Sequence, residues 1–371
     1  MSNILYIGPY REFSSDGNIS RNYISALVAA GHNVSIKPIY NIFKSFPEQE
    51  IAKDILDLEK NSYKKYHSVI QHCYPHQYYS DSRFDNNIGI LNLESFNYNN
   101  RLLDFLKIPD KLIAPSNYAK FCANECSRFD LRIDVIPPPI DLENIKKYRK
   151  NNTKEIDNKL FTFYVIEDFI NKSNLNILLE AFWLAVDNED DINIVIKTKN
   201  KNQEHTDLYQ TIEYEFGRLG SMISKFNRKP KIVIGEIKND AMYYFHNNNS
   251  CYVDISSGKN FGYSVLEALS FDNPIITTEQ TAQSEIVEGT DNFIVASDIT
   301  YCKDESKNYN MYNTIDQRWY APNLQNLIEQ INNVIHEDYN HKIERIKKSR
   351  TKLLDKYSIS AVINLFKNYD L

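Results

Sequence analysis

Short apolar runs rich in β-branched residues alternate with helical patterns along almost the whole chain. This alternation is typical of parallel α/β units, in which a helix covers the sheet between one strand and the next. Two series of such runs occur. They are residues 4–8, 33–39, 68–72, 88–93, 111–115 and 134–138 in the first series, and 160–166, 192–198, 231–235, 250–256, 273–278 and 292–296 in the second. The pattern predicts an α/β protein with two Rossmann-like domains.

A seam separates the two series. It consists of Pro137-Pro138-Pro139 and a charged, asparagine-rich stretch that runs to about Lys159, a composition that suits a hinge or a surface linker. A chain of 371 residues is long enough for two domains of ordinary size. We therefore expect domains at residues 1–145 and 146–356. Open parallel sheets bind ligands at the carboxyl ends of their strands, so a site is expected there.

The region after the last predicted strand reads differently. Residues 300–317 have no apolar periodicity, which predicts a loop insertion. Two helical patterns follow, at residues 324–336 and from residue 342 to the end.

The composition argues against several classes of protein. A formal charge of -6 gives no overall attraction to nucleic acid or anionic lipid, so a nucleic-acid partner is not expected unless a local patch provides one. No apolar run approaches the roughly 20 residues needed to span a bilayer, and strand residues begin almost at once, without a secretory signal. The five cysteines are scattered, without a C-x-x-C pair, which favours reduced thiols over zinc ligands. We therefore expect a cytoplasmic protein without a metal.

One stretch, residues 340–357, is strongly basic. Its cations are Lys342, Arg345, Lys347, Lys348, Arg350 and Lys352. A solvated helix face explains such a run, and a peripheral contact with a membrane or another anionic polymer is the alternative.

A glycine loop between a strand and a helix is the most informative local signal. The apolar run at residues 251–256 is broken by serines and glycines, and helix formers at helical spacing resume at residues 263–271. The N–H groups near Phe261, Gly262 and Tyr263 would face a phosphate at the positive end of the helix dipole, and glycine lets that ligand approach the backbone. The pattern therefore predicts an anion site.

Two side chains of this segment are further candidates. Glu267 lies about one turn into the helix, and its carboxylate would reach sugar hydroxyls beside the phosphate. The alternative is a glutamate that caps the helix or pairs locally. Ser256 either hydrogen-bonds a phosphate or holds the loop.

The same segment resembles a known motif. Residues 261–269 (FGYSVLEAL), followed by Pro274-Ile275-Ile276 and Glu285-Ile286-Val287, are similar to the donor-binding segment of the group 1 (family 4) retaining glycosyltransferases of the GT-B fold. The resemblance extends over most of the chain. It includes residues 4–10, a helix predicted at residues 21–34, and residues 110–121, 134–145 and 175–185.

The resemblance implies both a fold and an activity. The fold is GT-B, in which two Rossmann-like domains face each other across an interdomain cleft and a C-terminal helix, here residues 357–371, packs back on the first domain. The activity is transfer of a sugar from a nucleotide-diphosphate sugar, such as a UDP- or GDP-sugar, to an acceptor hydroxyl of an unknown glycan, lipid-linked or other molecule. It implies retention of configuration, no metal and no cofactor beyond the donor. In the family the helix glutamate, here Glu267, holds the ribose hydroxyls.

Three positions depart from the family pattern. The family has a glutamate eight positions before the helix glutamate, where this chain has Lys259. A glycine-arginine pair and a later lysine clamp the diphosphate in the family. Here Glu167-Asp168 and Ser173 align with them, with Lys172 beside the latter.

Three interpretations of these departures stay open. In the first, the positive charge has moved, so that Lys259, Lys172 and Arg21 serve the phosphates while Asp168 pairs with a lysine. In the second, Lys259 meets an unusual donor, such as one with an acidic sugar. In the third, the chain is a non-catalytic relative that binds a glycan or supports a partner. Transfer to a nucleic-acid base ranks behind these, because it would require a basic groove.

The remaining candidates lie near predicted strand ends. His72 and Glu94 follow strands of the first domain, where an imidazole would bind a hydroxyl and a carboxylate would orient an acceptor or act as a base. Gly17, in a loop expected at residues 10–18, resembles a phosphate-facing turn. Gly235 and Ile237 lie where the family packs the nucleotide base against backbone. The candidate catalytic residues are thus Lys259, Lys172, His72 and Glu94.

Overall fold

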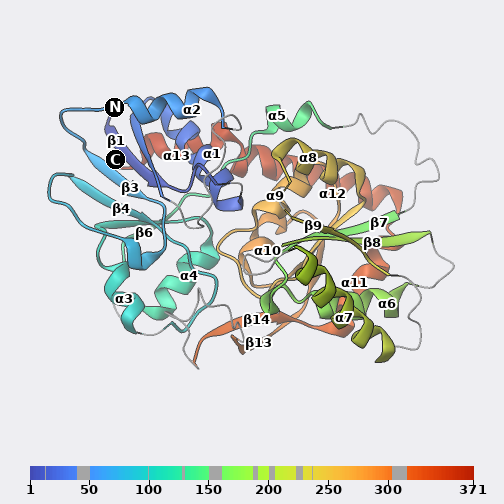
Figure 1. Cartoon of the computed structure of the whole chain (residues 1–371). Coiled ribbons are helices and arrows are strands. Elements are labelled where there is room, and N and C mark those ends of the chain that lie inside the picture. Colours follow the sequence, from blue (N-terminus) through green and yellow to red (C-terminus); the bar gives the residue numbers. More distant parts are fainter. Residues whose placement is uncertain are drawn as a thin grey trace. The chain divides into compact units, whose positions relative to one another are not determined.

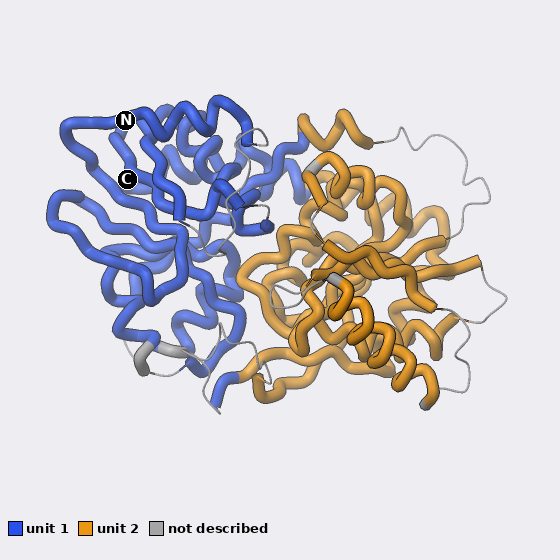
Figure 2. Tube along the Cα trace, viewed as in Figure 1, with its two compact units in different colours: residues 1–142, 312–317, 352–371 blue, residues 143–311, 318–351 orange. Residues whose placement is uncertain are grey.

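The chain divides into two compact units, which Figure 2 shows in different colours. The computed structural model describes residues 1–12, 14–39, 51–98, 100–127, 130–149, 161–186, 191–199, 205–222, 229–235, 237–302 and 316–371. The first unit comprises residues 1–142, 312–317 and 352–371, and the second comprises residues 143–311 and 318–351. The chain therefore enters the second unit and returns to the first at its end.

The first unit is built on a parallel sheet with the strand order β2-β1-β3-β4-β5-β6, and Figure 1 labels its strands β1, β3, β4 and β6. Its strands are β1 (Asn3–Gly8), β2 (Asn33–Pro38), β3 (Ser68–Gln71), β4 (Asn86–Ile90), β5 (Lys111–Ala114) and β6 (Ile133–Val135). Its helices are α1 (Ser15–Ala29), α2 (Lys53–Asp57), α3 (Asn100–Leu106), α4 (Asn117–Cys126) and α13 (Ile359–Asn368). The last helix packs against α1, where the ring centroids of Tyr23 and Phe366 lie 5.9 Å apart.

The second unit contains a parallel sheet with the order β12-β11-β10-β7-β8-β9. Its strands are β7 (Phe161–Ile166), β8 (Ile192–Thr198), β9 (Lys231–Ile234), β10 (Cys251–Asp254), β11 (Ile275–Thr278) and β12 (Phe293–Val295). Its helices are α5 (Leu142–Lys146), α6 (Leu175–Ala185), α7 (His205–Met222), α8 (Asn239–Asn248), α9 (Tyr263–Ser270), α10 (Ala282–Val287), α11 (Leu324–Ile335) and α12 (Tyr339–Lys352). This strand order places a topological switch point between β7 and β10, where such sheets bind ligands.

The predicted strands are confirmed. Each apolar run of the two series overlaps one of the strands β1 to β12. The reason is visible in β10, whose four residues are all buried. A strand of a parallel sheet is covered on both faces, so its sequence is continuously apolar and easily read.

The prediction of a loop at residues 300–317 is wrong for its first residues. Residues Ser297–Tyr301 form β13, which pairs antiparallel with β14 (Arg318–Pro322). β13 is half-buried or exposed along its length, and its neighbour β14 contributes the buried Trp319 and Tyr320. A strand held by its partner rather than by its own burial has no apolar signal. Residues 303–315 lie outside the described part of the chain.

The first helix begins earlier than the pattern at residues 21–34 predicts. Helix α1 starts at Ser15, because the Ser14 hydroxyl caps it by accepting a hydrogen bond from the Gly17 N–H at 3.1 Å. A Cβ on Gly17 would lie 2.0 Å from the Glu12 carbonyl oxygen, so only glycine lets the loop pack on this helix. Gly31, at φ 93°, then ends it. Gly17 therefore lies in the first turn of α1 rather than in the expected loop.

Candidate active site

Two carboxylates mark the switch point of the second sheet. Glu167 follows β7 directly, and Asp254 is the last residue of β10, the strand next to β7. Both side chains are nearly inaccessible, at 7% and 0% exposed. Two buried like charges repel and lose their hydration, so this arrangement requires a cation.

Lys259 supplies that cation. Its Nζ donates to Asp254 Oδ2 at 2.7 Å and also to Glu167 Oε1. Burial lowers the pKa of Lys259, but the two carboxylates outweigh burial and hold that pKa above its usual range, so the amine stays charged. The lysine thus pairs with Glu167 and Asp254, whereas the sequence interpretation paired Asp168 with a lysine.

Within this triad, Glu167 has a pKa near neutrality. The pKa of Glu167 is raised to about 7, because burial and the neighbouring Asp254 raise it by more than Lys259 and Lys172 lower it. Lys172 is buried beside the triad, and its carbonyl oxygen accepts a hydrogen bond from the Ser257 N–H at 2.8 Å. Two lysines and two carboxylates therefore meet at this end of the sheet.

The loop after β10 is held by its own side chains. The Ser256 hydroxyl donates to Asp254 Oδ1 at 2.6 Å, and Gln283 Nε2 donates to the Ser256 carbonyl at 2.8 Å. Asn174, in a left-handed conformation at φ 53°, donates from Nδ2 to the Ile255 carbonyl at 2.8 Å. Ser256 is thus buried and holds the loop, one of the two roles that its sequence position allowed.

Gly262 brings the start of α9 against α10. It is the residue before α9 and has no side chain to cap the helix. A Cβ at this position would lie 2.7 Å from the Gln283 Cβ and 2.9 Å from its Cα. Glycine is therefore required here because the backbone before α9 packs closely against α10. Phe261 and Tyr263 are buried on either side of it.

We expect Gly262→Ala to lower the free energy of unfolding by about 1–3 kcal/mol, because the added methyl group must displace α10 backbone. Thermal unfolding measures this loss. Gly217→Ala is the matched control: a Cβ there meets nothing within 4 Å in the middle of α7, so it should stabilise the protein slightly. Equal stability of the Gly262 variant and the unchanged protein would contradict the packing argument.

Glu267 is a buried carboxylate without a hydrogen bond from any residue that the structure describes. It lies in α9 with its side chain 7% exposed. His246 Nε2 lies 3.7 Å from Oε2, which is beyond hydrogen-bond distance. The residue neither caps the helix nor forms a close local pair. A carboxylate buried in this way is poised to accept hydrogen bonds from a ligand.

His246 presents an N–H toward Glu267. Asn273 Nδ2 donates both to the His246 carbonyl and to the Tyr164 hydroxyl, each at 2.8 Å. The Tyr164 proton is therefore directed to His246 Nδ1, which lies 2.8 Å away. With Nδ1 as acceptor, the imidazole carries a proton on Nε2. The network of Asn273, Tyr164 and His246 thus orients a donor at the carboxylate.

In the first unit, His72 is held by hydroxyl groups. Its Nδ1 lies 2.9 Å from the Tyr6 hydroxyl and 2.8 Å from the Ser20 hydroxyl. Burial lowers the pKa of His72 to about 3, so the ring is neutral. It follows the carboxyl end of β3, the position that the sequence predicts for a hydroxyl-binding imidazole.

The other candidates of the first unit have local partners. Arg21 NH1 donates to the carbonyl oxygens of Tyr10 and Glu12, at 2.5 and 3.0 Å, and so ties the loop to α1. Glu94 is half-buried, and its backbone N–H donates to the Tyr98 hydroxyl at 3.1 Å. Gly17 and Arg21 lie together on α1, whereas Glu94 lies after β4.

The candidates near β9 have a backbone explanation. Gly235 has φ 109°, which favours glycine, and its N–H donates to the Thr198 carbonyl at 3.1 Å. Ile237 is half-buried beyond it. A base-packing role for Gly235 and Ile237 stays a prediction.

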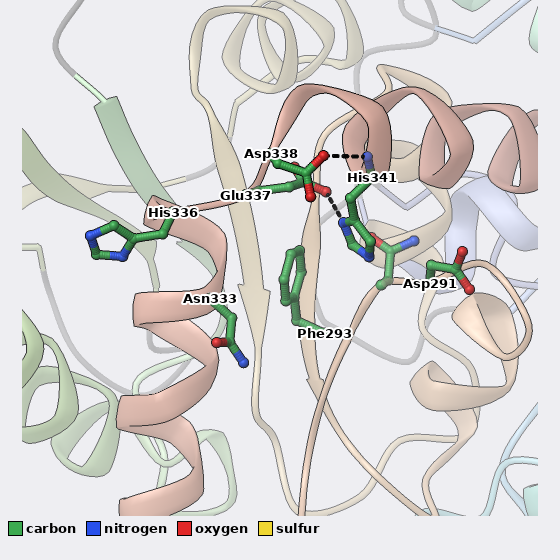
Figure 3. A pocket seen from close by; sticks show the side chains of 8 residues that line it. Asp291, Phe293, Asn333, His336, Glu337, Asp338 and His341 are labelled. Carbon is green, nitrogen blue, oxygen red and sulfur yellow. Dashed lines mark hydrogen bonds and ion pairs between the residues drawn. The ribbon is translucent and has the colours of Figure 1, made fainter.

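A cavity of about 510 Å³ lies away from these residues (Figure 3). It is at the amino end of β12, the end of the sheet opposite Asp254. Its lining residues are Asp291, Asn292, Phe293, Asn333, His336, Glu337, Asp338 and His341. Its acidic groups are engaged: Glu337 accepts from His341 Nδ1 at 2.8 Å, and Asp291 pairs with Lys348 at 2.6 Å. The lining thus stabilises the junction of α11 and α12.

The basic stretch forms α12 and is largely neutralised by neighbouring acids. Arg345 is fully buried and pairs with Glu337, and Arg350 pairs with Asp272 at 2.7 Å. Lys348 binds Asp291, as above. The predicted solvated face therefore includes cations that serve the packing of the second unit.

Among the residues that the structure describes, no group of three or more histidine, cysteine, aspartate or glutamate side chains is placed to hold a metal ion. None of the described helices has both the length and the apolar character that crossing a membrane requires.

Comparison with known proteins identifies the fold. No family model and no curated protein matches the chain. The OtsA apo structure matches at 10% sequence identity with a TM-score of 0.66, covering 100% of each chain. A trehalose-6-phosphate structure from E. coli, bound with UDP-2-fluoro glucose, matches at 10% identity and a TM-score of 0.67, again over 100% of each chain. HepE of Anabaena, in complex with UDP and glucose, matches at 12% identity and a TM-score of 0.61 over 98% of each chain.

The chain has the GT-B fold. The neighbours are GT-B glycosyltransferases, and they match this chain over nearly its whole length. Identity at this level establishes architecture, whereas activity must be argued from the site itself.

Proposed function

We propose that this protein is a glycosyltransferase that moves a sugar from a nucleotide-diphosphate sugar, a UDP- or GDP-sugar, to an acceptor hydroxyl. The single observation that carries the proposal is Glu267, a buried carboxylate with no hydrogen bond from the described residues, on the helix that follows the glycine loop. Neighbours with UDP-2-fluoro glucose or with UDP and glucose support the donor class.

The residues of the second unit suit the parts of such a donor. Glu267 would accept hydrogen bonds from the two ribose hydroxyls, with the His246 ring 3.7 Å from its carboxylate. The start of α9 would place backbone N–H groups and the positive end of the helix dipole toward the diphosphate. Lys259 and Lys172 would provide positive charge. In the first unit, neutral His72 would bind a sugar or acceptor hydroxyl.

The reaction we propose retains configuration and needs no divalent metal. The bond between the sugar C1 and the diphosphate oxygen breaks, the acceptor oxygen bonds to C1 on the same face, and the acceptor proton passes to the departing phosphate. Lys259, Lys172 and the N-terminus of α9 would stabilise the negative charge that develops on that phosphate. The acceptor is a glycan, a lipid-linked sugar or another hydroxyl compound.

One observation favours a second function. Lys259 is already bound by two carboxylates, so the charge that a diphosphate requires is engaged within the protein. A GT-B protein that binds a glycan or supports a partner without catalysis would tolerate this arrangement. Transfer to nucleic-acid bases is not supported in this way, because much of the basic stretch at residues 340–357 forms ion pairs with acidic residues of the protein.

Purified protein incubated with a panel of UDP- and GDP-sugars separates these functions. We expect a nucleotide-dependent rise in melting temperature, and release of UDP or GDP when sugar acceptors are supplied. Stabilisation without release from any donor and acceptor pair would favour the non-catalytic function. If no nucleotide sugar of the panel stabilises the protein and no nucleotide is released, the proposed enzymatic activity is wrong.

A further inference from the structure

The triad of Lys259, Glu167 and Asp254 occupies the switch point with its charges paired internally. Asp254 Oδ2 lies 2.7 Å from Lys259 Nζ, and Glu167 binds the same amine. The lysine side chain is 16% exposed, more than either carboxylate. Of the three side chains, that of Lys259 is therefore the most accessible to an anion that arrives from solvent.

We propose that Lys259 binds the diphosphate of the donor and that this binding is coupled to uptake of one proton by Glu167. The inference rests on the proposed function, because it takes the ligand to be a nucleoside diphosphate. A site with two carboxylates accepts a negatively charged ligand in this way because one carboxylate is neutralised by a proton from solvent as the ligand enters.

The choice of Glu167 follows from what surrounds it. The neighbouring charged and titratable groups are Asp254 and Tyr252 on β10, Lys259 in the loop before α9, and Lys172 in the loop after β7. Asp254 is held by two further donors, the hydroxyl and the N–H of Ser256 at 2.6 and 3.3 Å. Hydrogen bonds to a carboxylate favour its ionised form. Glu167 is therefore the carboxylate that takes up the proton.

The sign of the coupling follows from linkage. The pKa of Glu167 is already raised to about 7 by burial, and a phosphate at Lys259 adds a like charge beside it and raises that pKa further. Binding then takes up protons at pH values between the free and the bound pKa. Across that window the Kd for the nucleotide increases by up to about tenfold per pH unit, because each unit of pKa shift corresponds to a factor of ten. Lys259 stays charged throughout, because its own pKa is raised.

Isothermal titration calorimetry with UDP and with GDP tests the coupling. Titrations between pH 7 and pH 9, in two buffers of different ionisation enthalpy, count the protons exchanged. This range lies above the second phosphate pKa of about 6, so the nucleotide itself contributes few protons. For the unchanged protein we expect uptake approaching one proton and a Kd that increases about tenfold from pH 7 to pH 8.5.

Glu167→Gln should abolish the uptake, flatten the pH dependence and tighten UDP binding at pH 8.5 by about tenfold. Glu213→Gln is the matched control, since Glu213 also pairs with a lysine of the same unit, Lys229, at 3.4 Å; it should leave the proton count unchanged. Circular dichroism and thermal unfolding establish that both variants are folded.

The outcomes are distinct. Binding of UDP or GDP without proton uptake, or with uptake that persists in Glu167→Gln, overturns the coupling and leaves the proposed function standing. Absence of binding in both the unchanged protein and the variant overturns the proposed function, and the coupling with it.

Discussion

Glu267→Gln is expected to stabilise the nucleotide-free protein and to weaken nucleotide binding. The carboxylate is buried without a hydrogen bond from the described residues, so its neutral isostere should raise the free energy of unfolding by about 1 kcal/mol. A charged hydrogen-bond acceptor for ribose hydroxyls is worth about 1.5–3 kcal/mol, so the affinity for UDP or GDP should fall by about 10- to 100-fold. Thermal unfolding with and without nucleotide measures both effects.

A variant that is more stable but binds nucleotide more weakly distinguishes a ligand-binding residue from a structural one. Glu288→Gln, which changes an exposed carboxylate just after α10, is the control and should alter neither quantity. A Glu267→Gln protein that is less stable but binds nucleotide normally would show that the residue serves the fold. The proposed ribose contact would then be wrong.

Arg345→Met is expected to lower the free energy of unfolding by about 3–5 kcal/mol, the usual effect of removing one partner of a buried ion pair. Arg345 is fully buried and forms two bonds to Glu337, from Nε at 2.7 Å and from NH2 at 2.9 Å. Without the guanidinium, Glu337 keeps only His341 as its partner among the interactions described above. Chemical denaturation measures the loss.

The double variant Arg345→Met and Glu337→Leu should recover most of that stability, since it leaves no unpaired buried charge. Lys347→Met, on the same helix, is the control: its side chain is 75% exposed and it should change stability by less than about 0.5 kcal/mol. If Arg345→Met and Lys347→Met were equally mild, α12 would be a surface helix after all.

The pH dependence gives an independent check. Burial raises the pKa of Glu337, but Arg345 and His341 outweigh burial and hold that pKa below its usual range. A carboxyl whose pKa is lower in the folded state stabilises the protein above the unfolded-state pKa. This stabilisation is lost as the pH falls through the folded-state pKa. The difference in stability between the unchanged protein and the double variant should therefore diminish in acid.

The fold was largely predictable because its information is local. Each of β1 to β12 is marked by its own apolar run, since burial on both faces leaves little room for polar residues. The strand β13 had no such mark, because β14 provides the buried side chains of the pair. The start of helix α1 was predicted too late in the sequence, because its first turn depends on the Ser14 cap and on the contact between Gly17 and Glu12.

The site was predictable only in part, for a related reason. Gly262 and Glu267 could be named as candidates because loop and helix adjoin in the sequence. Glu167 and Lys259 were noticed as separate departures, and their pairing was missed because they lie 92 positions apart. Asp254 had one available signal, a charge inside an apolar strand. His246 had none, since its role comes from Tyr164 and Asn273 in distant segments.

The bond between Lys259 and Glu167 also makes the two positions dependent on each other in evolution. Replacing the lysine alone by an acid would bury three carboxylates together with Asp254, and replacing the glutamate alone by a base would set two cations side by side. Either single step passes through a protein of lower stability. Reversal of the two charges without such a loss therefore requires both substitutions together.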